Sequence, residues 1–130
     1  MQNLEPLAVT AAARMVGSDV NSAENMINKS LMVLAEQGVC AFGLFLASRS
    51  RQQDVDAAKL IHSAINDLLL ETGLVKDSYG KVDADFYKEI TAQRKNEDEL
   101  AALQRLLLTK QLMETTLTYG RYQAKARAKA

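Results

Sequence analysis

Apolar residues recur every three or four positions through most of this 130-residue chain. That spacing places them on one face of an α-helix. In the segment 23–37 the residues with this spacing are Met26, Ile27, Leu31 and Leu34. The next run, Val39–Ser48, is apolar on nearly every side, so we expect it to be the most buried helix. Gly38 separates the two segments and favours the left-handed conformation that ends many helices.

The same periodicity, together with residues that start or stop helices, predicts four more helices. They are residues 5–17, residues 54–72, a short helix capped by Asp83, and residues 97–123. Asp54 is the expected N-cap of the second of these helices, and Gly73 its end. Asn96 and Glu99 have the spacing of a capping box that opens the last helix. Expected inward positions are Val55, Ala58, Ile61, Ile65, Leu68, Leu69, Phe86, Tyr87 and Ile90. In the last helix the apolar positions include Leu100, Leu103, Leu107, Leu112 and Leu117.

Composition supports an all-α fold. Glycine occurs six times and proline once, and strong helix formers dominate the rest of the chain. A length of 130 residues is that of one domain with a real core. We therefore predict a compact bundle of about five to six helices. Residues 1–123 form the single helical domain, and residues 124–130 form a basic C-terminal tail that frays.

The chain gives no indication of a membrane or of secretion. The apolar run Leu31–Ser48 has the length of a membrane span, but Glu36 lies near its middle. A charge at that depth costs roughly 2.5–3.5 kcal/mol on insertion scales. The N-terminus lacks the charged and apolar regions of a secretory signal, and the only cysteine is Cys40. We expect a cytoplasmic protein in a reducing compartment.

Candidate catalytic chemistry is sparse. His62 is the only histidine, so this chain cannot build a multi-histidine metal cluster, and we expect His62 to be partly buried in the core or at its rim. Cys40 lies among apolar residues and is expected to be a buried thiol, although a Cys40–His62 dyad stays open. No glycine-rich phosphate loop occurs. We expect no enzyme activity, no cofactor and no metal site.

Charge is distributed unevenly along the chain. Residues 1–100 hold 10 basic and 15 acidic side chains, whereas residues 101–130 hold six basic side chains and one acidic. Arg121, Lys125 and Lys129 recur every four residues and would form one positive stripe on a helix, with Tyr119 and Tyr122 beside it. Such a stripe with aromatic neighbours is typical of nucleic-acid contact. Cations that favour the negative end of a helix, or a solvated tail, are the alternatives.

Two stretches of the sequence resemble a known family. The first is Lys29–Val39 followed by Ala41–Arg49, a lysine-led helix, a glycine step and an apolar segment. The second is Arg105–Ala124, with Thr109, Gln111 and the pair Arg121-Tyr122. Together they are similar to the small all-α subunit of the type III-B CRISPR effector, the Cmr RNA-targeting complex. The sequence departs from that family at Gln37, where Asn is usual, in having no Pro after the leading lysine, and in having no Trp in the last helix. The type III-A small subunit and an unrelated helical bundle are the alternatives.

The resemblance implies a non-catalytic subunit in antiviral defence. Copies would stack into a short filament inside the complex, beside its other subunits, and a basic face would contact guide RNA and target RNA. The RNA-binding residues that it implies on matched stretches are Lys29, Arg49, Arg105, Lys110 and Arg121. Lys125 joins them from the charge stripe alone.

Two other functional classes compete with RNA binding. A DNA-binding helix-turn-helix would need a polar recognition helix after Gly38, and the segment that follows is far too apolar. The remaining alternative is a helical protein–protein adaptor, or a small regulator, without nucleic-acid contact.

Overall fold

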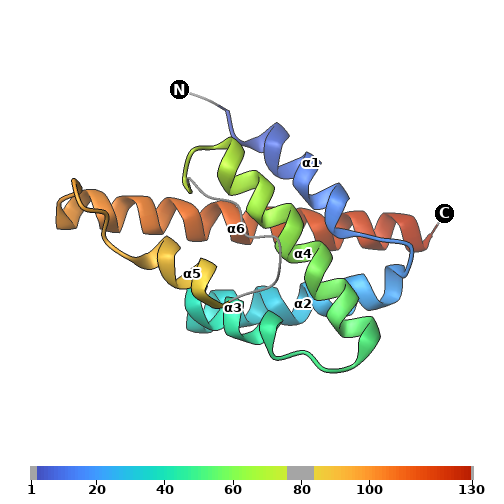
Figure 1. Cartoon of the computed structure of the whole chain (residues 1–130). Coiled ribbons are helices and arrows are strands. Elements are labelled where there is room, and N and C mark those ends of the chain that lie inside the picture. The colour runs from blue at the N-terminus through green and yellow to red at the C-terminus, as the bar shows by residue number, and fades with distance from the viewer. Residues whose placement is uncertain (1–2, 76–83, 130) are drawn as a thin grey trace.

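The computed structural model describes residues 3–75 and 84–129, and these residues form six helices and no strand (Figure 1). The helices are α1 (Glu5–Met15), α2 (Val20–Gln37), α3 (Val39–Ala47), α4 (Gln52–Glu71), α5 (Ala84–Thr91) and α6 (Glu99–Ala128). The predicted compact all-α bundle is confirmed.

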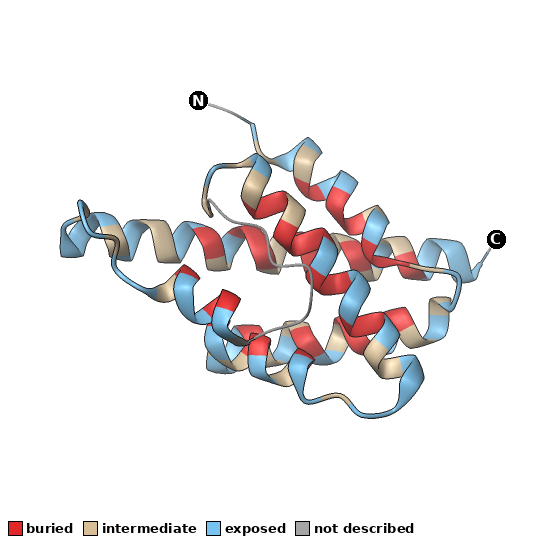
Figure 2. Ribbon diagram, viewed as in Figure 1, coloured by how far each residue is buried: buried red, intermediate tan, exposed pale blue. Residues whose placement is uncertain are grey.

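The long helix α6, with 30 residues, forms one side of the bundle. Helices α1 and α2 pack against its C-terminal half, and both also contact α4, which crosses in front of α6 in Figure 1. Helix α3 packs between α2 and α5. Figure 2 shows the buried residues on the sides that face one another. The expected core positions Ala58, Ile61, Ile65, Leu68, Leu69, Phe86, Tyr87 and Ile90 are all buried, and Val55 is half-buried.

Two glycines end helices as expected. Gly38 has a φ of 101° between α2 and α3, and Gly73 has a φ of 76° after α4. Side chains with a Cβ rarely adopt these values, so glycine is required at both turns. The ψ of Gly38 is −176°, outside the left-handed helical region, because α3 begins directly afterwards.

Two predicted helix caps were wrong. Helix α4 begins at Gln52, so Asp54 lies in its first turn instead of at the N-cap, which is Arg51. Helix α6 begins at Glu99, and its cap is Asp98, whose carboxylate accepts the Ala101 N–H at 2.7 Å. The predicted cap Asp83 lies outside the described residues.

The C-terminal residues 124–128 continue α6 instead of fraying from Ala124. Ala124 is fully buried. The Arg127 guanidinium donates to the carbonyl oxygens of Val16 at 2.6 Å and Ala13 at 3.0 Å. These bonds satisfy carbonyls at the end of α1 and hold the last turns of α6 against it.

An aromatic cluster joins α3, α4 and α5. The ring centroids of Phe42 and Tyr87 lie 5.3 Å apart, and those of Phe86 and Tyr87 lie 4.9 Å apart. His62 is 2% exposed, and its Nδ1 lies 2.9 Å from the Tyr87 hydroxyl. Burial raises the pKa of Tyr87 above its usual range. The expectation of a buried Cys40 was wrong, because its thiol is exposed, 3.5 Å from the Thr91 hydroxyl.

Candidate nucleic-acid interface

The C-terminal half of α6 carries the predicted cationic stripe. Arg121 and Lys125 are separated by four residues, which is about one helical turn or roughly 6 Å of rise. The Lys125 side chain is 57% exposed, and Lys129, one turn further on, is exposed as well. Arg121 is half-buried and Lys129 is the C-cap residue of α6, so the exposed part of the stripe consists of Lys125 and Lys129 at the end of the helix.

A seam between α2 and α6 borders the stripe. The Lys125 ammonium lies 4.0 Å from a Glu24 carboxylate oxygen, the outer limit of an ion pair. One turn along each helix, the Oδ1 of Asn28 and the Nε of Arg121 are buried without a hydrogen-bond partner in the described part of the chain. Because the two helices run antiparallel, a buried donor and a buried acceptor thus lie at the same level of the seam. A buried polar atom without a hydrogen-bond partner costs stability, so this level of the seam is less well satisfied than the rest of the bundle.

An exposed tyrosine accompanies the cations. Tyr122 is 57% exposed, and the Arg121 guanidinium lies 5.7 Å from the centre of its ring. Tyr119 is turned toward α1, where its hydroxyl donates to a Glu5 carboxylate oxygen at 3.2 Å. That hydrogen bond raises the pKa of Tyr119. Of the two tyrosines, Tyr122 is the exposed one, and exposure is what stacking on a base requires.

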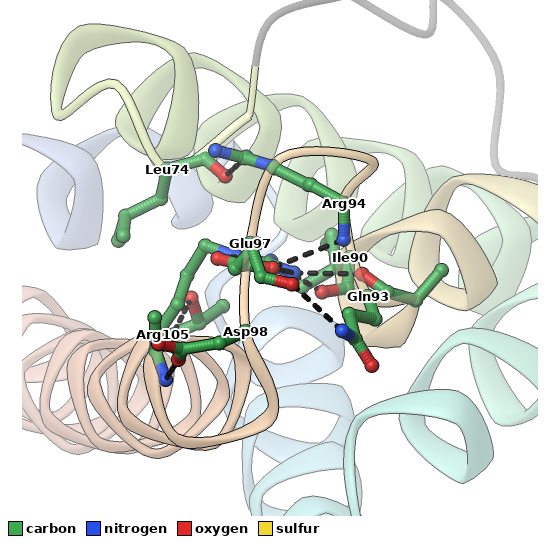
Figure 3. Close-up of polar contacts among 10 residues, drawn as sticks. Leu74, Ile90, Gln93, Arg94, Glu97, Asp98 and Arg105 are labelled. Atoms are coloured by element: carbon green, nitrogen blue, oxygen red, sulfur yellow. Dashed lines mark hydrogen bonds and ion pairs between the residues drawn. The ribbon is translucent and has the colours of Figure 1, made fainter.

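Arg105, which the resemblance placed among the RNA-binding residues, has an internal role (Figure 3). Its side chain is 9% exposed, and it donates to both carboxylate oxygens of Glu97, at 2.9 and 3.1 Å. It also donates to the carbonyl oxygens of Ile90 and Ala92, at 2.7 Å each. These four bonds tie the end of α5 to the start of α6, and they leave the guanidinium no forked face for a phosphate.

Glu97 is held by the same cluster. Besides Arg105, it accepts the backbone N–H of Arg94 at 3.0 Å, and the Arg94 guanidinium donates to the carbonyl oxygen of Leu74 (Figure 3). The pKa of Glu97 is lowered to about 2, and the hydrogen bonds from Arg105 are the largest cause. The cluster therefore locks the connection between α5 and α6 while Glu97 is ionised.

Two of the other predicted residues, Arg49 and Lys110, each have a partner nearby in the sequence. Arg49 stacks 4.0 Å above the Phe45 ring and donates to the Phe45 carbonyl at 3.0 Å. Lys110 lies 3.8 Å from Glu114, one turn along α6. Lys29 is exposed on α2. Of the six predicted residues, Arg121 and Lys125 lie one turn apart on α6, whereas Arg105 and Arg49 are held by hydrogen bonds within the chain.

Sequence reasoning missed Asn28. A lone Asn in a helix carries no signal, and its place opposite Arg121 depends on the register in which α2 packs on α6. The internal roles of Arg105 and Arg127 were missed for the same reason. Each depends on which backbone carbonyls the folded chain brings near the guanidinium.

The helices pack around a single core and form a small all-α bundle. Comparison with known proteins does not assign this bundle to a family. No family model, no curated protein and no solved structure matches the chain. Within residues 3–75 and 84–129, no three His, Cys, Asp or Glu side chains are grouped so as to hold a metal ion. Over the same residues, every helix falls short of the length and apolarity that crossing a bilayer requires.

Proposed function

We propose that this protein is a non-catalytic RNA-contacting subunit of a type III-B CRISPR complex that targets RNA with a guide RNA. In this proposal the C-terminal half of α6 contacts the RNA backbone. The observation that carries the RNA contact is the placement of Arg121 and Lys125 one turn apart on a rigid helix beside the exposed ring of Tyr122. The CRISPR assignment rests on the sequence resemblance over Lys29–Arg49 and Arg105–Ala124.

The geometry narrows the set of contact residues. The guanidinium groups of Arg105 and Arg49 donate hydrogen bonds to backbone carbonyls and neighbouring side chains. We therefore leave both residues out of the RNA surface. Lys29 and Lys110 are exposed or half-buried and stay secondary candidates. Contacts of this kind bind phosphate oxygens, so binding is independent of RNA sequence and falls steeply with salt.

The adaptor class has one observation in its favour. The N-terminal half of α6 exposes several leucines, which is typical of a protein-binding surface. That surface lies on a different part of the helix from Arg121 and Lys125. Protein binding there is compatible with RNA contact at the other end of α6.

The test measures the affinity of the purified chain for fluorescently labelled RNA, duplex and single-stranded, between 50 and 200 mM salt. We expect the double variant Arg121→Ala/Lys125→Ala to bind more weakly and to reduce the salt slope by about 2, since each lost phosphate contact removes about one unit. Lys59→Ala, an exposed lysine on α4, is the matched control and should leave the slope unchanged. Equal slopes for wild type and the double variant would refute the RNA surface. Failure to co-purify with a guide RNA and larger subunits in its native host would refute the CRISPR assignment separately.

A further inference from the structure

The first half of α6 exposes a leucine face on the outside of the bundle. Leu100, Leu103 and Leu107 are 64%, 52% and 58% exposed. At 100° per residue they lie within about 60° of one another around the helix. The buried Thr109 and Thr116 lie on the opposite side. We call Leu100, Leu103 and Leu107 the leucine face.

The leucine face is accessible over its whole length. In Figure 1 the first turns of α6 extend past the other helices, and only the connection from α5 runs alongside. Figure 2 shows this end of α6 as mostly exposed or half-buried, in contrast to the buried turns further along the helix. A contiguous stripe of leucines on a projecting helix is unusual for a monomer and marks an interaction surface.

Charges at the two ends of the leucine face select the partner. Asp98 and Glu99 precede it, and Lys110 follows it one turn after Leu107. If two copies of α6 lie antiparallel across this face, the Lys110 of one copy comes within about one turn of Asp98 and Glu99 of the other. A parallel pair would instead place acid beside acid and lysine beside lysine. The face is thus complementary to itself in one orientation.

We infer that two copies of this protein pair through the leucine face, with their α6 helices antiparallel about a two-fold axis near Leu103 and Gln104. Such an interface uses the same patch on both copies and closes on itself, unlike a head-to-tail stack, which needs two different patches. The pairing involves neither Arg121 nor Lys125. It therefore stands whether or not the chain binds RNA.

Sedimentation velocity over a range of protein concentrations tests the pairing. The full chain should sediment as a dimer at tens of micromolar and should not grow further. The variant Leu103→Gln/Leu107→Gln should raise the dissociation constant at least tenfold, with an unchanged helical circular dichroism spectrum. Met32→Gln, at an equally exposed apolar residue of α2, is the control and should change nothing. A monomer at every concentration, or a dimer that tolerates both glutamines, would overturn the inference.

Charge exchange and cross-linking test the orientation. Glu99→Lys should weaken the dimer by about two- to tenfold, and adding Lys110→Glu to it should restore the affinity. In a Cys40→Ser background, Gln104→Cys should form a disulfide between copies. Gln111→Cys should not, because an antiparallel pair separates the two copies of residue 111 by about 22 Å along the axis. Cross-linking at both positions would show a parallel pair and would refute the proposed arrangement.

Discussion

Two buried glycines make a matched test of how α3 and α6 are packed. Gly43 in α3 and Gly120 in α6 both lie inside helices, both are buried, and neither has a positive φ. Replacing either one by alanine improves helix propensity by about 1 kcal/mol. The two sites differ in what the added methyl group meets, so the same substitution should have opposite consequences.

At Gly43 the methyl group would overlap Tyr87. The Cβ would lie 2.4 Å from Cδ2, 2.6 Å from Cγ and 2.8 Å from Cβ of that side chain. The last of these atoms cannot move unless α5 moves. Overpacking a core in this way costs roughly 1–3 kcal/mol, and this overlap belongs at the upper end of that range. After subtraction of the propensity gain, Gly43→Ala should destabilise the fold by about 2 kcal/mol.

At Gly120 the two nearest atoms to the methyl group would belong to flexible side chains, and the Ala12 carbonyl oxygen would lie at an ordinary contact distance of 3.9 Å. The methyl group would lie 3.1 Å from the Met15 sulfur and 3.3 Å from the Ile27 Cδ1. The Met15 and Ile27 side chains need to move by a few tenths of an ångström. We expect this shift to cost less free energy than the gain in helix propensity. Gly120→Ala should therefore be between neutral and about 1 kcal/mol more stable than wild type.

Urea and thermal unfolding of the two variants measure the difference. We expect the unfolding free energies of the two variants to differ by about 2–3 kcal/mol, which corresponds to about 10 °C in Tm at roughly 4 °C per kcal/mol for a domain of this size. Hydrogen exchange should localise the loss in Gly43→Ala to α3 and α5. Equal stability of Gly43→Ala and Gly120→Ala would refute the close packing of α3 on Tyr87.

Two further predictions concern the start of α6. Because Arg105 holds the pKa of Glu97 at about 2, below its ordinary value of 4.5, the pair's stabilisation is complete above about pH 4.5 and is lost as the pH falls toward 2. Urea unfolding of Arg105→Met should therefore show a flatter decline over that range than wild type does, and parallel pH profiles would contradict the cluster. Asp98→Ala should cost about 1 kcal/mol of unfolding free energy through loss of the N-cap, whereas Asp98→Asn should be close to neutral. Equal losses in both Asp98 variants would show that charge, and not capping, matters there.

Helix positions were predictable because periodicity and glycines encode them locally. Five helix bodies were predicted within a few residues of their observed ends, and Gly73 ended α4 as expected. The caps were less predictable, since several polar residues near each end compete. At the start of α6, Asn96 and Asp98 are both suitable N-cap residues. In the folded chain Asp98 is the cap, and Glu97 accepts hydrogen bonds from Arg94 and Arg105.

The candidate site was only partly predictable, because a basic residue looks the same in sequence whether it faces solvent or a carbonyl. The four-residue spacing of Arg121 and Lys125 places them on one helix face without knowledge of the fold. Arg105 belongs to an equally basic helix, yet its neighbours in space come from α5 and the connection to α6. The leucine face was not predicted for the reverse reason, because apolar residues with helical spacing are expected to be buried whether or not another helix covers them. Leu100, Leu103 and Leu107 fit the helical apolar pattern, but none of the helices in residues 3–75 and 84–129 covers them.

The basic excess at the C-terminal end is smaller at the surface than the sequence suggests. Of the six cations in residues 101–130, Arg105 and Arg127 donate to backbone carbonyls, and Lys110 lies near Glu114. The stripe that begins at Arg121 can therefore make only a few phosphate contacts, so one chain alone should bind RNA weakly.

Pairing through the leucine face would set the basic ends of two α6 helices about 60 Å apart, pointing in opposite directions. The two surfaces are too distant to disturb each other, so leucine-face variants should leave the salt slope of a single RNA site unchanged. Any gain from pairing should instead appear as avidity, and only on RNA long enough to reach both ends.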